Sequence, residues 1–164
     1  MIITLTNGES REFQNGMSAL DIAAAISHKL AKKALAARID GVVKDLNTVI
    51  DADCRVEILT FEDEDGKKAL WHTASHIMAQ AVKRLFPSAK LAIGPAIDTG
   101  FYYDFDVEKS FDADDLVRIE EEMRRIVEAD LPLERFELPR EEALALMKDE
   151  PYKQELINDL PEDA

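Results

Sequence analysis

The sequence has 164 residues, of which 46% are hydrophobic, and its formal net charge is −14 at pH 7. This length suits one ordinary domain or two small ones, and a content of only 6 Gly and 6 Pro excludes a low-complexity or disordered chain. A surface this acidic repels phosphate, so we do not expect the chain to bind nucleic acid strongly on its own.

The distribution of charge and the lack of targeting segments in the sequence further limit the class of protein to which it could belong. Residues 1–61 carry 7 basic and 8 acidic side chains, whereas residues 62–164 carry 13 and 26, which we interpret as a source of solubility. No apolar run approaches the roughly 18 residues of a membrane-spanning helix, and the first residues do not form a signal peptide. Cys54 is the only cysteine, so no internal disulfide can form, which fits the reducing cytoplasm.

Residues 1–61 have the pattern of a compact unit of strands and one helix. Short apolar strands are predicted at residues 2–5, 11–14, 36–39, 42–43 and 56–59. The Asn-Gly pair at 7–8 and the Asp-Gly pair at 40–41 tolerate positive φ and predict turns. Ser18 is expected to cap a helix, with Asp21 completing a capping box, and residues 46–50 form a crossover.

Residues 62–66, Glu-Asp-Glu-Asp-Gly, form a polar break that predicts the domain boundary. Residues 69–86 contain no Gly and predict a helix ending before Pro87. Its apolar stripe would consist of Leu70, Ala74, Ile77, Ala81 and Leu85. His72 and His76 are then one turn apart on a common face, roughly 180° from that stripe.

Two imidazoles on one helix face can bind a metal, orient a water molecule or hold a nucleotide hydroxyl. A metal ion would need at least one or two further ligands. Thr73 also stands where a metalloprotease helix has the glutamate that acts as its general base. The alternative is a pair of solvated histidines without a function, and the residues alone leave these alternatives open.

The remaining residues alternate between strand and helix patterns. Residues 91–105 predict a strand, a turn and a second strand, punctuated by Gly94-Pro95 and Thr99-Gly100. A charged helix is predicted at residues 112–129, with an apolar stripe of Leu116, Ile119, Met123 and Ile126. A third strand at 133–138 and short helices at 140–148 and 152–157 follow.

Four motifs together point to a known family: His72-x-x-x-His76 in its helix, Leu91-Ala-Ile-Gly-Pro95, Gly100-Phe-Tyr-Tyr-Asp104 and Tyr152-Lys153. They closely resemble the amino-terminal region of bacterial threonyl-tRNA synthetases, over essentially the whole chain. The resemblance implies an α+β fold. It assigns residues 1–61 to a TGS domain of the β-grasp, ubiquitin-like type and residues 62–66 to a linker. Residues 67–164 would be the first part of an editing domain of the threonyl/alanyl-tRNA synthetase type.

In that family the editing site hydrolyses seryl-tRNA, and half of it is the histidine pair, matched here by His72 and His76. The resemblance assigns substrate binding or catalysis to four more residues: Gly94, Pro95 and Tyr103 for binding, and Lys153 for contact with a phosphate or the ester carbonyl. A structural aromatic ring and a solvated lysine are the alternatives for Tyr103 and Lys153. The other half, a Cys-x-x-x-His motif, has no match in this sequence, so we expect an incomplete editing domain.

The implied function is that of a cytoplasmic aminoacyl-tRNA ligase that joins threonine to its tRNA with ATP and clears seryl-tRNA. ATP, Mg and a zinc ion are implied for a catalytic domain that this chain lacks, and no cofactor or metal is expected in the chain itself. The implied partners are the threonine-specific tRNA and a second subunit in a homodimer, with no membrane. We expect this piece alone to be inactive. A non-catalytic TGS-containing regulatory or ligand-binding module and a metal-binding protein remain alternatives.

Overall fold

The computed structural model describes residues 1–134 and 136–161. It divides into two compact units, Met1–Trp71 and His72–Ala164, and each has a hydrophobic core of its own. Within the described residues, no helix is long and apolar enough to cross a membrane.

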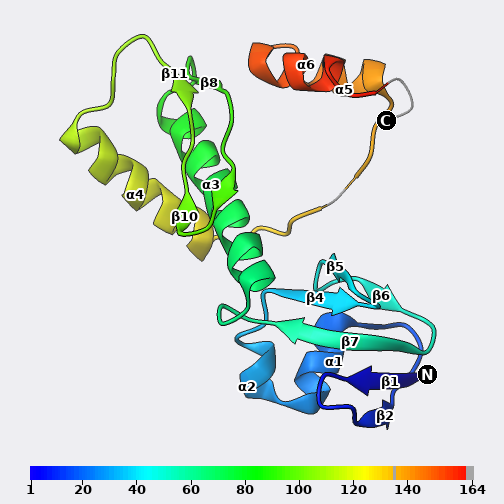
Figure 1. Cartoon of the computed structure of the whole chain (residues 1–164). Coiled ribbons are helices and arrows are strands. Elements are labelled where there is room, and N and C mark those ends of the chain that lie inside the picture. The colour runs from blue at the N-terminus through cyan, green and yellow to red at the C-terminus, as the bar shows by residue number, and fades with distance from the viewer. Residues whose placement is uncertain (135, 162–164) are drawn as a thin grey trace. The chain divides into compact units, whose positions relative to one another are not determined.

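The first unit is built on a five-stranded mixed sheet with the order β2-β1-β7-β4-β5 (Figure 1). Its strands are β1 (Ile2–Leu5), β2 (Ser10–Glu12), β4 (Ala36–Ile39), β5 (Val42–Lys44) and β7 (Cys54–Leu59). β1 and β7 run parallel, and the other neighbours run antiparallel. The remaining elements are β3 (Met17–Ser18), which pairs with β6 (Val49–Ile50), and the helices α1 (Ala19–Ile26) and α2 (His28–Ala31). This is the β-grasp arrangement expected for residues 1–61.

Local sequence features fix the turns and the helix start of this unit. Gly8 has φ +82°, and the pair at 40–41 has φ +47° and +85°, which are the left-handed conformations that Asn-Gly and Asp-Gly turns predict. The Ser18 hydroxyl oxygen accepts a hydrogen bond from the Asp21 amide, and the Asp21 carboxylate accepts one from the Ser18 amide. The predicted capping box is therefore confirmed.

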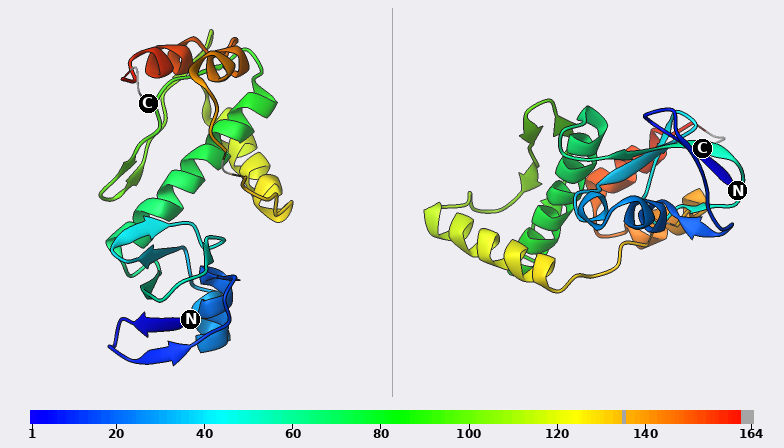
Figure 2. Two further views of the ribbon diagram at one scale, coloured as in Figure 1. Left: turned by 90° about the vertical axis from the view of Figure 1, so that its right-hand side faces the viewer. Right: turned by 90° about the horizontal axis from the view of Figure 1, so that it is seen from below.

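Helix α1 packs on one face of the sheet, and this can be followed in the views of Figure 2. Ala19 and Ile22 from the helix meet Ile3, Leu5 and Val56 from the strands in a buried cluster. The strand residues of this cluster alternate with more exposed neighbours, as expected for strands with one face in a core. Packing of these aliphatic side chains therefore holds α1 against the sheet.

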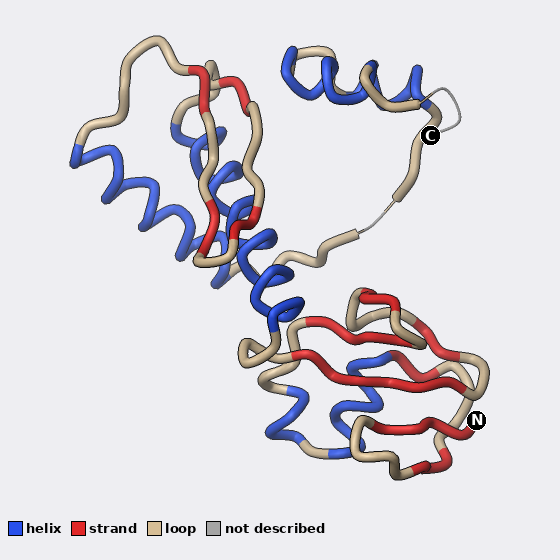
Figure 3. Tube along the Cα trace, in the orientation of Figure 1, coloured by secondary structure: helices blue, strands red, loops and turns tan. Residues whose placement is uncertain are grey.

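The second unit combines helices with a long, irregular hairpin (Figure 3). The helices are α3 (Glu64–Leu85, of which the part from His72 lies in this unit), α4 (Ala113–Glu128), α5 (Arg140–Leu146) and α6 (Pro151–Asn158). In the hairpin, β8 (Lys90–Leu91) pairs with β11 (Phe105–Asp106), and β9 (Ala96–Ile97) pairs with β10 (Gly100–Phe101). The two ladders place residues 90–106 on a single out-and-back path.

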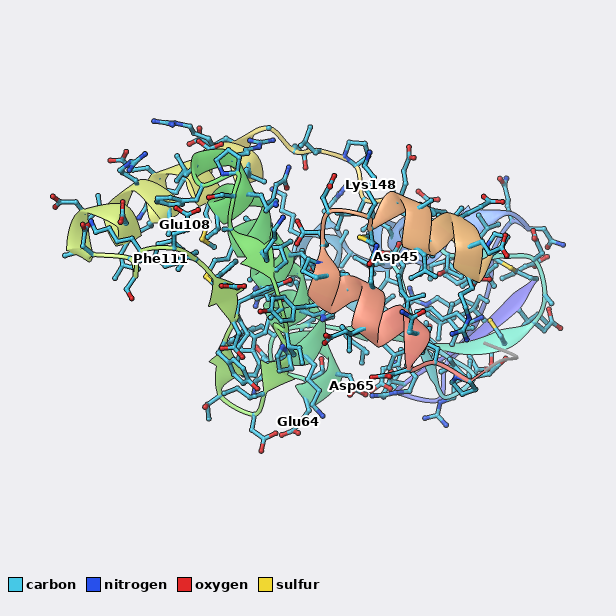
Figure 4. The ribbon with its side chains drawn as sticks, turned by 90° about the horizontal axis from the view of Figure 1, so that it is seen from above. Asp45, Glu64, Asp65, Glu108, Phe111 and Lys148 are labelled. Carbon is cyan, nitrogen blue, oxygen red and sulfur yellow. The ribbon has the colours of Figure 1, made fainter. Side chains whose placement is uncertain are left out.

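The core of the second unit lies among α3, α4 and the start of the hairpin. Val82 of α3 and Ile119 and Ile126 of α4 are buried there. Phe105 of β11 and Phe111 of the loop before α4 pack against them, and Figure 4 labels Phe111 in that loop. The predicted stripe of α4 is thus confirmed at its two isoleucines, whereas its first member, Leu116, is 60% exposed.

Helix α3 begins earlier than the sequence indicated. Residues 64–66, which were assigned to a linker, form its first turn, and Glu64 and Asp65 of that turn are labelled in Figure 4. Their negative charges suit the positive end of the helix dipole. Gly66 is buried inside the helix because a Cβ at this position would overlap the carbonyl group of Thr60. The glycine marks a close backbone approach and not a break, while the domain boundaries at 61 and 67 stay predictions.

Three other elements differ from the expected ones. The strand predicted at residues 11–14 is Ser10–Glu12, and the crossover at 46–50 contains the short strand β6. The strand predicted at 133–138 is absent from its described residues, 133–134 and 136–138. Leu133 and Phe136 are 77% and 65% exposed there, and no described strand pairs with the segment. A short segment with apolar residues forms a strand only where a neighbouring strand satisfies its backbone groups.

Candidate functional site

The side chains of His72 and His76 meet on the surface of α3. Their Nε2 atoms are 3.0 Å apart, and their ring centroids are 4.6 Å apart with an interplanar angle of 74°. The spacing of four residues therefore puts both rings on one face, as predicted. In a hydrogen bond between two Nε2 atoms one nitrogen donates and the other accepts, so at least one of the two imidazoles is neutral.

Both histidines are exposed, while Ile77, Ala81 and Leu85 of the predicted stripe pack in the core, but the buried surface of α3 extends closer to the pair than the sequence predicted. Ser75 and Ala79 are neighbours of the histidines around the helix, and both are buried. The Ser75 hydroxyl donates to the His72 carbonyl oxygen at 2.7 Å and lies 3.2 Å from the carbonyl oxygen of Gly94 in the hairpin. The small side chains of Ser75 and Ala79 allow the hairpin to lie close to α3. The prediction missed this buried surface because it relied on large apolar residues.

The hairpin carries the residues that were assigned to substrate binding. The ring of Tyr103 covers Gly94 so closely that a Cβ at position 94 would overlap it. Tyr103 also stacks on Phe105, with centroids 4.8 Å apart and an interplanar angle of 20°. Pro95 follows Gly94 in the same loop and is half-buried. Glycine is thus required at position 94 for space, and the aromatic ring fills that space.

Lys153 reaches the hairpin from α6. Its Nζ donates a hydrogen bond to the Ala92 carbonyl oxygen at 2.9 Å and lies 5.7 Å from the centroid of the Tyr103 ring. The structure therefore gathers residues that the sequence places far apart. The histidine pair comes from α3, Gly94 and Tyr103 come from the hairpin, and Lys153 comes from α6.

The electrostatics of the site favour neutral imidazole. Burial, the neighbouring His72 and the positive charge of Lys153 lower the pKa of His76 below its ordinary value. A neutral ring near pH 7 has a nitrogen that can accept a proton or orient a water molecule. In the described part of the chain, no group of three or more His, Cys, Asp or Glu side chains could hold a metal ion.

Two charged residues support the site without having been predicted. Glu150, which immediately precedes α6, forms an ion pair with Lys83 of α3 at 2.6 Å and accepts a hydrogen bond from the Leu91 amide at 2.9 Å. No sequence motif predicts this ion pair, because the sequence does not indicate which charged residues far apart along the chain come into contact. The only signal in the sequence is that Glu150 lies three residues before Lys153, which was predicted to be a site residue.

Comparison with known proteins gives two results. Residues 1–60 match the TGS domain family. Proteins named threonine–tRNA ligase match the chain along nearly its whole length. Those of Clostridium kluyveri and Caldanaerobacter subterraneus subsp. tengcongensis are 60% and 57% identical over 99% of the chain. That of Acetivibrio thermocellus is 57% identical over 98%. The chain spans about a quarter (26%) of the length of these relatives. The resemblance predicted from the motifs is therefore confirmed.

Proposed function

We propose that this protein works as the amino-terminal region of a threonine–tRNA ligase, and that the site around His72 and His76 contributes to the hydrolysis of seryl-tRNA. The name of the relatives supports the ligase assignment. The convergence of the histidine pair with Lys153 and the Tyr103 hairpin is the observation that supports the hydrolytic site. The residue roles come from the resemblance and from the chemistry of these side chains.

The need for such a site follows from the two amino acids. Threonine and serine differ by one methyl group, and a pocket gains only about 1–3 kcal/mol from a group of that size, which corresponds to roughly 10–200-fold discrimination. Both amino acids carry the hydroxyl, so a site that recognises it cannot reject serine. A second site that removes serine from the tRNA solves this problem.

Hydrolysis requires a positioned water molecule and a route for its proton. The water oxygen adds to the ester carbonyl carbon, and the bond from this carbon to the ribose oxygen of the tRNA breaks, which gives free serine and free tRNA. A neutral imidazole of the His72–His76 pair accepts the proton of the water, and the ribose oxygen takes up a proton as it leaves. Lys153 stabilises the negative charge on the ester carbonyl oxygen or on a phosphate. Gly94, Pro95 and Tyr103 shape the wall on which the substrate lies.

The wider activities are proposals for the complete ligase. It would activate threonine with ATP and Mg, hold a zinc ion in its catalytic domain, bind the threonine-specific tRNA and act as a cytoplasmic homodimer. The present sequence contains neither a Gly-rich phosphate loop nor a Cys-x-x-x-His motif. We therefore expect the 164-residue chain alone to activate no threonine and to hydrolyse little seryl-tRNA. Efficient deacylation by the isolated chain would contradict this expectation.

The test uses a complete ligase that carries this sequence. Replacement of His72 and His76 by Ala should leave the charging of tRNA with threonine nearly intact and let seryl-tRNA accumulate. His28, an exposed histidine on α2, provides a matched control, and His28→Ala should change neither reaction. Loss of threonine charging with intact removal of serine would place the pair in the synthetic site and overturn the proposal.

A further inference from the structure

The segment before and within the first turn of α6 is attached to the hairpin almost residue by residue. Three contacts follow one another along β8 and the residue after it: Lys90 Nζ to the Asp149 carbonyl oxygen (2.8 Å), the Leu91 amide to the Glu150 carboxylate (2.9 Å), and Lys153 Nζ to the Ala92 carbonyl oxygen (2.9 Å). A fourth joins the Tyr152 hydroxyl to the Asp106 carboxylate of β11 at 3.0 Å.

Glu150 is the most enclosed member of this set. Its side chain is 13% exposed, and it bridges two elements, because one carboxylate oxygen accepts from the Leu91 amide and the other pairs with Lys83 at 2.6 Å. Lys83 also donates to the carbonyl oxygens of Pro87 (3.2 Å) and Ala89 (2.9 Å), so the end of α3 holds it in place. An enclosed pair of this kind is costly to break on one side, since the remaining charge loses its partner.

Among the described residues, the other side-chain hydrogen bonds of helix α6 lead to α5, where Arg140 donates to the carbonyl oxygens of Ile157 and Asn158, and these bonds do not attach α6 to the hairpin or to α3. It is eight residues long, and neither it nor α5 contains a buried residue. Helices this short are not stable by themselves. Glu150 stands at the N-cap of α6, yet its side chain makes no capping hydrogen bond and points instead to β8. The position of α6, and with it that of Lys153, therefore depends on the contacts of residues 149–153.

We infer that Lys83 and Glu150 are positioning residues. Their ion pair joins the start of α6 to the end of α3, while Glu150 also binds the Leu91 amide of the hairpin, and together these contacts hold the ammonium group of Lys153 near His76. The inference rests on the proposed function only where it concerns hydrolysis. The positioning of Lys153 by Lys83 and Glu150 is a property of this chain alone. Lys83 and Glu150 touch no substrate in this scheme. They act through Lys153, and their removal should release its charge from the histidine pair.

The test follows the ring protons of His76 by NMR titration of the 164-residue chain. Lys153 lowers the pKa of His76, so Lys153→Met should raise that pKa toward its ordinary value. Glu150→Ala and Lys83→Met should raise it as well. Glu150→Gln, which keeps an oxygen for the Leu91 amide and loses the charge, should give an intermediate value. Glu142→Ala, at an exposed position on α5, should leave it unchanged.

A double-mutant comparison separates the positioning of Lys153 from a general loss of packing, which would also raise the pKa by exposing His76. In a Lys153→Met background, the rise caused by Glu150→Ala should be clearly smaller than in the wild-type chain. An equal rise in both backgrounds, or an unchanged pKa in Glu150→Ala and Lys83→Met, would overturn the inference. If the titrations agree with it but His72→Ala and His76→Ala leave the removal of serine intact in the ligase, the positioning of Lys153 stands and the proposed function fails.

Discussion

The Nε2 atoms of His72 and His76 lie 3.0 Å apart and share one hydrogen bond. If both rings were fully protonated, both nitrogens would be donors and the bond would be lost. Burial and the charge of Lys153 oppose protonation of His76 in addition. The geometry therefore keeps a proton acceptor in the site at neutral pH and couples the state of each ring to the other.

Acid should weaken the second unit through His76. The folded-state pKa of this residue is lowered from the ordinary 6.5, so between these two values the unfolded chain binds more protons than the folded one. The free energy of unfolding should thus be at its full value above about pH 7.5 and fall as the pH drops through the ordinary pKa. Urea unfolding at several pH values measures this slope. His76→Gln should reduce it, and a slope that is unchanged in this variant would contradict the assignment.

Gly94→Ala should disturb the hairpin, because the new Cβ overlaps the Tyr103 ring and the ring is held by its stack on Phe105. Overpacking of this kind costs about 1–3 kcal/mol of unfolding free energy. The measurement is the thermal or urea midpoint of the chain. In a Tyr103→Ala background the same substitution should cost much less, since the ring is gone. A similar loss in both backgrounds would mean that the backbone of Gly94, and not the space beside it, is the constraint.

The fold of the first unit was largely predictable because its determinants are local. The Asn-Gly and Asp-Gly turns, the Ser18 cap and the apolar strands each depend on a few residues. The structure contains them, with the second strand at Ser10–Glu12 instead of 11–14. The second unit was harder, since its features depend on contacts between distant segments. A strand was predicted at residues 133–138, yet its described residues pair with no described strand. Gly66 was predicted to end a linker, but it lies inside α3, where the nearby Thr60 carbonyl leaves no room for a Cβ.

The candidate site shows the same division. The spacing of His72 and His76 predicts their contact, because four residues along a helix bring side chains together whatever surrounds them. The burial of Ser75 was not predictable, since it depends on how closely the hairpin approaches α3. The ion pair of Lys83 and Glu150 was missed for the same reason. Sequence patterns identified the side chains that could take part in catalysis. Tertiary contacts determine which other residues position those side chains.

The capping box of α1 provides a stability test within the first unit. Ser18→Ala removes the acceptor for the Asp21 amide and should lower the free energy of unfolding by about 0.5–2 kcal/mol. Ser18→Asp keeps an acceptor at this position and should retain most of the stability. The comparison is made by urea unfolding, with far-UV circular dichroism to follow the helices. Equal stability of the Ala and Asp variants would show that the cap contributes nothing to this unit.

We expect the histidine pair to hold no structural zinc in this chain. Zinc in structural sites takes about four ligands, whereas His72 and His76 supply two and use their Nε2 atoms on each other. Thr73, Ser75, Gln80 and Lys83, at nearby positions of the helix, are poor zinc ligands. Within the described residues, no third His, Cys, Asp or Glu joins the pair in a potential metal cluster. Elemental analysis after extensive dialysis should therefore find no stoichiometric zinc. A stoichiometric zinc ion that is lost in His72→Ala but kept in His28→Ala would refute this prediction, and the pair would then be a metal site instead of a place for water and proton transfer.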